Sequence, residues 1–267
     1  MTVKLPESPS QMRFVPIPRL AAGGRWRVEA MRSLSEPLLL WYTRGQGRIT
    51  VAGTTRGYGP HNAVFIPAGI MHGFEVSSQV FGTAVFFGRA STVTLPDGPH
   101  HLRIRDSATL MELNATLDAV QRELDSDRPA HDRATRHHLG LLGVWLERQV
   151  AQAAPDTVRP DAARKLAARY AALLERDFRS GKGVADYAQV LGVTPTHLSR
   201  VCNQACGRAA SVLLQERVLF EARKLLAETR APVKSIAESL GFRSPAYFTR
   251  AFQHRTGQTP TAFRRNA

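Results

Sequence analysis

The chain has 267 residues, enough for two domains of ordinary size, and 43% of them are hydrophobic, enough to form buried cores. Its net charge of +14 is uneven: residues 161–267 carry 18 Lys and Arg against 8 Asp and Glu, whereas residues 1–160 carry 18 against 14. Two cysteines are too few for a disulfide framework. The N-terminus lacks a secretory signal and no apolar run is long enough to span a bilayer, so we expect a cytoplasmic protein without a membrane partner.

The first part of the chain, residues 1–105, is typical of a small β-sandwich or barrel. A polar arm at residues 1–13 precedes short apolar or alternating stretches, which are separated by turns rich in Gly and Pro. We expect strands at residues 25–31, 38–42, 49–51, 63–66, 73–76 and 80–87.

One stretch of this part resembles the second motif of the cupin jelly roll. It runs from Pro67 through Gly69 to His72 in the pattern Pro-x-Gly-x-x-His. Metal-binding cupins take their other ligands from a first motif, a His-x-His and a Glu, but no histidine lies between Trp26 and Tyr58. One histidine does not make a metal site, so we expect a cupin-like domain without a metal or other cofactor. His72 then lines a pocket or is held by hydrogen bonds.

A barrel of this size can hold a small ligand in its mouth. An aromatic and basic lining suits a small organic acid, a sugar or a phenolic compound, and the alternative is that the aromatic side chains fill the interior and no ligand binds. The candidate effector-binding residues are Trp26, Trp41, Arg48, His72, Phe74 and Phe86.

Residues 106–153 change to a helical period. Apolar residues recur in alternating steps of three and four, as in the seam of a coiled coil, at Leu110, Leu113, Leu117, Val120 and Leu124. Asp106 or Ser107 is the expected cap of this helix, and a second helix is expected over residues 133–152. The helices either cover an open side of the β-domain or also pair with their copies, and we expect a homodimer. Residues 154–160 contain two prolines and predict a linker.

The last part, residues 161–267, contains the same helical device twice. In each copy a Leu-Gly pair ends one helix, and the glycine, Gly192 or Gly241, can take the left-handed conformation that such an end requires. A hydroxyl residue and a proline then begin the next helix, at Thr194 and Ser244. This pattern predicts helix-turn-helix motifs at 184–206 and 233–255, joined by a connector helix at 211–227.

These residues closely resemble the signature of the AraC/XylS transcriptional regulators. The matching stretches run from Ile236 to Ser244, from Tyr247 to Phe252 and from Gly257 to Arg264, and the first copy resembles the family's more variable first motif. The resemblance implies an α+β chain of two domains: an N-terminal cupin-like β-barrel with a helical dimerisation segment, and a C-terminal all-α domain with both motifs. It also implies sequence-specific binding to double-stranded promoter DNA, control by a small-molecule effector, and RNA polymerase as a further candidate partner.

Two recognition helices in one chain would enter successive major grooves, about 34 Å apart on straight DNA. The resemblance places base readout at Thr196, Ser199, Arg200, Ala246, Thr249 and Arg250. Arg200 and Arg250 can each form a bidentate pair with guanine. Phosphate contacts, which position the protein without reading sequence, are expected at Thr194, Arg208, Lys234, Arg243, Ser244 and Arg255.

Three alternatives stay open. A cupin-type metal enzyme with a DNA-binding tether is disfavoured by the missing first-motif ligands and by the lack of a nucleophile elbow or phosphate-binding loop, so we expect no enzyme. An architectural DNA binder with a vestigial barrel is the second. The third concerns Cys206, for which a redox role competes with core packing, whereas Cys202 aligns with Phe252 and is expected in the core.

Overall fold

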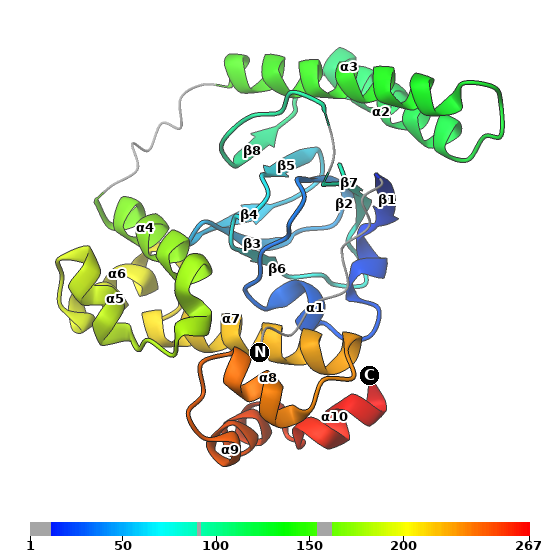
Figure 1. Ribbon diagram of the computed structural model, residues 1–267. Helices are drawn as coiled ribbons and strands as arrows, with labels where there is room; N and C mark the ends of the chain where they lie inside the picture. The colour runs from blue at the N-terminus through cyan, green and yellow to red at the C-terminus, as the bar shows by residue number, and fades with distance from the viewer. Residues whose placement is uncertain (1–11, 90–91, 154–161) are drawn as a thin grey trace.

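The computed structural model describes residues 12–89, 92–153 and 162–267 (Figure 1). The predicted linker at residues 154–160 lies outside the described residues. A β-rich N-terminal domain is flanked by a helical hairpin on one side and by a helical C-terminal domain on the other (Figure 1). None of the helices in the described ranges has the length and apolarity that a bilayer span needs.

The N-terminal domain contains two antiparallel sheets. The five-stranded sheet consists, in spatial order, of β1 (Arg13–Pro16), β7 (Phe81–Phe86), β2 (Leu38–Arg44), β5 (Asn62–Ile66) and β8 (His100–Arg103). The three-stranded sheet consists of β4 (Thr54–Tyr58), β3 (Gly47–Val51) and β6 (His72–Phe74). The described strands therefore form two open sheets. Five of the six expected strands are present, as β2, β3, β5, β6 and β7.

The remaining expected strand, at residues 25–31, was a wrong prediction. The chain instead forms a 3-10 turn, η1 (Ile17–Ala21), and one turn of helix, α1 (Trp26–Glu29). The alternation of apolar residues over 25–31 is typical of a strand with one buried face. Here the apolar side chains pack in two different places. Val28 packs between the two sheets, whereas the ring of Trp26 contacts the C-terminal domain.

Strand β2 shows how the five-stranded sheet forms two cores. Successive side chains of a strand point to opposite faces. Leu40 and Tyr42 therefore pack between the two sheets, whereas Leu39 and Trp41 pack on the outer face under two helices. Such a strand is apolar on both faces, which explains its unbroken hydrophobic sequence.

The two covering helices are α2 (Ser107–Leu124) and α3 (His131–Gln152). The carboxylate of Asp106 caps α2 by accepting the backbone N–H of Thr109 at 2.7 Å, as expected. The seam residues Leu113, Leu117 and Val120 are buried against α3 and the sheet of their own chain. The helices thus cover the open face of the sheet, which was the first of the two interpretations, and a dimer through them stays a prediction.

The C-terminal domain is entirely helical, with bounds close to those expected. Its elements are α4 (Ala162–Asp177), η2 (Phe178–Ser180), α5 (Val184–Leu191), α6 (Pro195–Cys206), α7 (Ala210–Glu228), α8 (Val233–Ser239), α9 (Pro245–Thr256) and α10 (Pro260–Asn266). One core gathers the apolar faces of these helices. The two predicted motifs are α5–α6 and α8–α9, and α7 is the connector.

The two domains are packed against each other. Met31 and Met71 of the N-terminal domain belong to the core of the C-terminal domain. The ring of Trp26 lies 5.7 Å from that of Phe220 in α7 and 5.9 Å from that of Phe263 in α10, measured between centroids. The interface between the domains therefore includes the core of the C-terminal domain as well as α7 and the last helix, α10.

Polar contacts accompany this packing. The Ser33 hydroxyl donates to the Glu175 carboxylate at 2.6 Å, and the Thr55 hydroxyl donates to the carbonyl of Cys206, the last residue of α6, at 3.3 Å. Arg27 pairs with Glu228 at the end of α7, 3.9 Å apart. The N-terminal domain thus contacts both halves of the C-terminal domain.

Candidate nucleic-acid interface

Both helix-turn-helix motifs are built by the local signals that the sequence carries. Gly192 and Gly241 have φ angles of 71° and 80°, in the left-handed region expected of them. The Thr194 hydroxyl accepts the backbone N–H of His197 at 3.2 Å, and the Ser244 hydroxyl accepts that of Tyr247 at 3.3 Å. These hydroxyls satisfy amides that the first helical turn leaves unpaired, so both recognition helices begin where predicted.

Gly241 is required for a second reason. A Cβ atom at this position would lie 2.7 Å from the Arg179 carbonyl oxygen and would overlap the backbone of Gly181. The turn of the second motif therefore packs directly on the turn after α4. At Gly192, by contrast, a Cβ atom would meet no atom within 4 Å.

The recognition helices α6 and α9 divide into buried and exposed faces as predicted. Leu198, Val201 and Cys202 of α6 are buried, as are Phe248 and Phe252 of α9. The six residues expected to read bases are exposed or half-buried: Thr196, Ser199, Arg200, Ala246, Thr249 and Arg250. This face is accessible, and base contact by these side chains stays a prediction.

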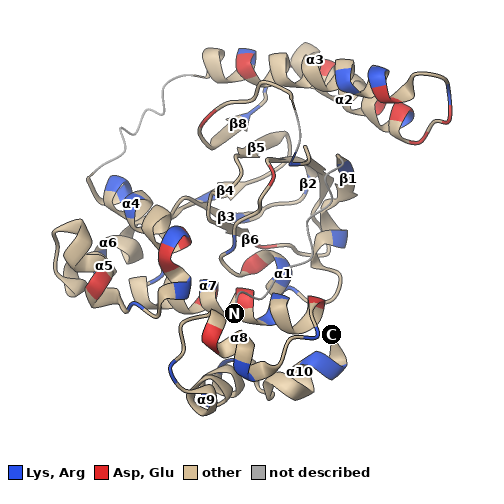
Figure 2. Cartoon of the chain, viewed as in Figure 1, with Lys and Arg blue, Asp and Glu red and all other residues tan. Residues whose placement is uncertain are grey.

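Several cations of this surface lack a paired carboxylate in the part of the chain that the structure describes. Lys234, Arg243 and Arg250 form no ion pair with any carboxylate in the described ranges, and all three are exposed. The Arg200 guanidinium lies 3.1 Å from Nδ1 of His197, which leaves its charge uncompensated by an acid. Charge of this kind is available to phosphates and to base edges. Lys and Arg residues are spread over the C-terminal helices in Figure 2.

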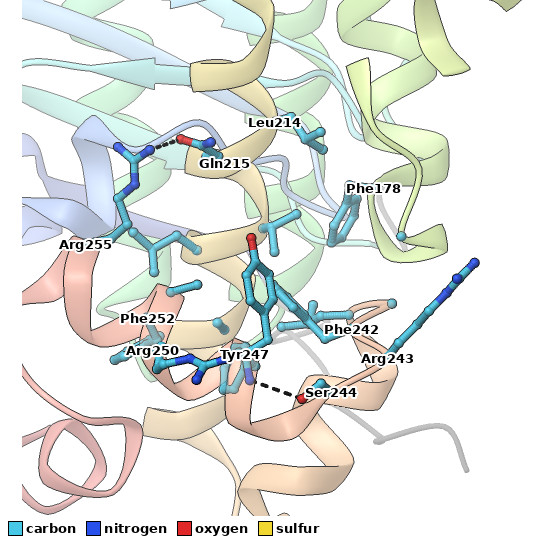
Figure 3. Close-up of a pocket in the computed structure, with 18 of the residues that line it drawn as sticks. Phe178, Leu214, Gln215, Phe242, Arg243, Ser244, Tyr247, Arg250, Phe252 and Arg255 are labelled. Carbon is cyan, nitrogen blue, oxygen red and sulfur yellow. Dashed lines mark hydrogen bonds between the residues drawn. The ribbon is translucent and has the colours of Figure 1, made fainter. Parts of the chain in front are cut away.

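A hollow of about 840 Å³ lies beside the second recognition helix, between α9, α7 and the turn after α4 (Figure 3). Its lining combines apolar residues such as Phe178 and Leu214 with the cations Lys182, Arg243, Arg250 and Arg255. Tyr247, which is not among the predicted site residues, lines the hollow and is 59% exposed. Its position next to Ala246 on the exposed face of α9 was the signal that could have identified it.

Five of the six expected phosphate contacts are exposed, and Arg208 does not share their environment. Thr194, Lys234, Arg243, Ser244 and Arg255 are exposed, and the Arg255 guanidinium donates to the Gln215 side chain. Arg208 pairs with Glu216 at 3.3 Å and lines a small cavity of about 140 Å³ between the two domains. In this arrangement Arg208 is directed at the N-terminal domain.

The structure does not bring the six candidate effector residues together. Trp26 packs on the C-terminal domain, and Trp41 lies under α2, where its indole N–H donates to Asn114 at 3.0 Å. Arg48 is exposed and pairs with Glu75 at 2.8 Å. The remaining three, His72, Phe74 and Phe86, are buried, and Phe74 and Phe86 belong to the core between the two sheets. Trp26 thus packs between the two domains and Trp41 between β2 and α2, and effector binding by the six residues stays a prediction.

Two buried groups near His72 were missed. Arg32 and Tyr42 lie with it on the interior side of the sheets. The one signal for them in the sequence is an arginine between the apolar residues Met31 and Leu34. In the described ranges, no group of three or more His, Cys, Asp or Glu side chains is arranged to hold a metal ion.

Both cysteines are structural in character. Cys202 and Cys206 are buried free thiols, and burial raises the pKa of Cys202 to about 12. Burial also raises the pKa of Cys206, whose thiol donates to the Cys202 carbonyl at 3.2 Å. Thiols of high pKa react slowly because the thiolate is the reactive form. Core packing therefore accounts for both, as expected for Cys202.

Comparison with known proteins matches the C-terminal domain. Residues 187–266 match a family model described as a helix-turn-helix domain. The arabinose operon regulatory protein of Salmonella typhimurium is 31% identical over 81 residues, 30% of this chain and 29% of that protein. The HTH-type transcriptional regulator GlxA of Rhizobium meliloti is 36% identical over 80 residues, 30% of this chain and 25% of that protein. The matched region thus spans under a third of these relatives.

Among solved structures, the C-terminal domain of AraT, a response regulator from Geobacillus stearothermophilus, is 29% identical. The match covers 39% of this chain and 84% of that one, with a TM-score of 0.36.

Proposed function

Because residues 187–266 form a helix-turn-helix domain of the AraC/XylS type, we propose that the whole chain is a transcriptional regulator that binds promoter DNA. One observation carries this proposal. The two recognition helices, α6 and α9, each present an exposed arginine, Arg200 and Arg250, on the face opposite the buried core, and neither has an acidic partner among the described residues. An uncompensated guanidinium at this position of a recognition helix suits a guanine in the major groove.

Control by a small molecule is the second part of the proposal. The N-terminal domain contacts α4 and α6 on one side and α7 and α10 on the other. A ligand that changes the N-terminal domain would therefore act on the first helix-turn-helix motif through α6, and on the second through its neighbouring helices α7 and α10. The cupin-like character of the two sheets, and a homodimer or RNA polymerase as partners, belong to the same proposal. No observation favours the alternative of a metal enzyme.

The test is selection of duplexes from a random-sequence library by the purified chain. If the chain is a sequence-specific regulator, one sequence should be enriched, and the chain should bind it more tightly than a scrambled version of it. The logarithm of the binding constant should fall linearly with the logarithm of the salt concentration, because phosphate contacts release counterions from the DNA. Equal affinity for the enriched and scrambled duplexes at every salt concentration would overturn the proposal.

A further inference from the structure

A guanidinium without a carboxylate partner lies inside the N-terminal domain. Arg32 is only 5% exposed, and its Nη1 donates to the carbonyl of Val28 at 2.6 Å. Its Cζ atom lies 5.2 Å from the centroid of the Phe74 ring. No Asp or Glu pairs with it in the described ranges, and burial lowers its pKa to about 10. Buried charges in proteins are normally paired or bind an ion, so this one needs an explanation.

Two further polar groups in the interior of the N-terminal domain lack partners among the described residues. The Tyr42 hydroxyl and Nε2 of His72 are buried, and neither forms a hydrogen bond with any residue that the structure describes. Nδ1 of His72 lies 2.9 Å from the Ile70 carbonyl, which can only accept, so Nδ1 carries the proton and Nε2 is a free acceptor. The three groups together offer a cationic donor, a hydroxyl and a nitrogen acceptor. Groups left unpaired in this way are rare in folded proteins.

The backbone brings these groups to one place. Arg32 and His72 face each other across an antiparallel bridge, with N–H···O distances of 2.9 and 2.7 Å. Phe74 lies two residues beyond His72 and therefore on the same side of strand β6. Phe74 and Tyr42 share the core between the two sheets.

We propose that Arg32, Tyr42 and His72 form the binding site of a small carboxylic acid that also carries a hydrogen-bond donor. The carboxylate pairs with the Arg32 guanidinium, and the donor, such as a hydroxyl, reaches Nε2 of His72 and the Tyr42 hydroxyl. Such a ligand satisfies all three groups at once. The inference rests on the proposed function, because it names the chemical class of the effector.

The same bridge connects this site to the DNA-binding domain. Side chains alternate along an extended chain, so the neighbours of Arg32 and His72 face the other way. Met31 and Met71 belong to the core of the C-terminal domain, and Ser33 donates to Glu175 of α4. A ligand that moves Arg32 and His72 therefore displaces side chains that hold the DNA-binding domain, and it changes the affinity for DNA.

The first experiment compares the thermal stability of the unliganded full chain with that of Arg32→Met. Removing an unpaired buried cation should raise Tm, by about 2–4 °C. Arg13→Met is the matched control, because Arg13 also lies over an aromatic ring, that of Phe86, but pairs with the buried Glu36 at 2.7 Å. It should lower Tm. A decrease for Arg32→Met as large as that of the control would show a structural role and overturn the proposal.

The second experiment measures calorimetric binding of lactate, 3-hydroxybutanoate and 4-hydroxybutanoate, each beside its uncharged carboxamide. We expect at least one acid to bind the wild type about tenfold more tightly than its amide, and Arg32→Met to lose that preference. Equal binding of acid and amide, binding of neither, or an unchanged preference in the variant would each overturn the proposal. Selection of duplex DNA by the same samples separates the two claims: specific DNA binding without acid preference rejects only the site, whereas its absence from the wild type rejects the proposed function.

Discussion

The hydroxyl of Ser33 donates to the carboxylate of Glu175 across the domain boundary, 2.6 Å apart and 142 residues apart in sequence. The same carboxylate accepts two N–H groups of Arg217, at 2.7 and 2.9 Å. Arg217 in turn pairs with Glu221, which also accepts from Arg179. A serine of the N-terminal domain thus joins a buried ion network that holds α4, α7 and the turn after α4 together.

This network predicts a difference between two substitutions. Ser33→Ala removes one hydrogen bond and should lower the free energy of unfolding by about 1 kcal/mol. Glu175→Ala leaves the Arg217 guanidinium, which is 5% exposed, with only one of its two acidic partners, and should cost about 3–5 kcal/mol. Urea unfolding followed by tryptophan fluorescence measures both. Equal losses for the two variants would show that the network does not stabilise the C-terminal domain.

The glycines in the turns of the two helix-turn-helix motifs should differ in how much stability their substitution by alanine costs. Gly192→Ala and Gly241→Ala both force a left-handed alanine, at a cost of about 1 kcal/mol. Only at Gly241 does the added Cβ also overlap the backbone of residues 179–181. Gly241→Ala should therefore destabilise the domain by about 2 kcal/mol or more beyond Gly192→Ala. Similar unfolding midpoints for the two variants would contradict the direct packing of these turns.

The pKa of His72 predicts how stability depends on pH. Burial, with the nearby positive charge of Arg32, lowers this pKa to about 3 from its usual 6.5. As pH falls through 6.5 the unfolded chain binds the proton first, so protons favour unfolding down to about pH 3. Between these values His72 removes roughly 1.4 kcal/mol of stability per pH unit. His72→Gln should lose less stability than the wild type from pH 6.5 to 4, in parallel urea titrations. Identical pH profiles would mean that His72 is accessible to protons in the folded protein.

Phosphate contact and base contact should differ in their salt dependence. Lys234 is exposed at the start of α8 and has no ion-pair partner in the described ranges. Lys234→Ala should weaken binding to all duplexes alike and reduce the logarithmic salt slope by about 1. Arg250→Ala should cost about 1–3 kcal/mol on the selected duplex and much less on a scrambled one. Fluorescence anisotropy at several salt concentrations distinguishes the two. A variant of Lys234 that loses affinity only for the selected sequence would reverse its assignment.

The C-terminal domain could be predicted closely because its signals are local. A left-handed glycine, a capping hydroxyl and a proline act within a few residues, so Gly192 and Thr194 fix the helix ends without help from the rest of the fold. The division of α6 into buried and exposed faces follows from helical periodicity alone.

The N-terminal site could not be predicted because it depends on distant partners. Trp41 was expected in a pocket, but the direction of its side chain depends on which face of β2 receives α2, 73 residues away at Asn114. Trp26 packs on α7 and α10, and no pattern in residues 25–31 predicts this contact. Arg32 could not be predicted as buried, because its neighbours in sequence do not show whether an isolated arginine lies inside the fold.

The most direct test of the account is whether the two recognition helices read two separate half-sites. Duplexes selected from a random library by the wild type, Arg200→Ala and Arg250→Ala should be compared, with the exposed Arg136→Ala of α3 as control. We predict two half-sites about 10 bp apart, with each recognition-helix variant relaxing the sequence of one half only, and the control leaving both unchanged. Unchanged motifs in both variants, or loss of the same positions in both, would contradict the account.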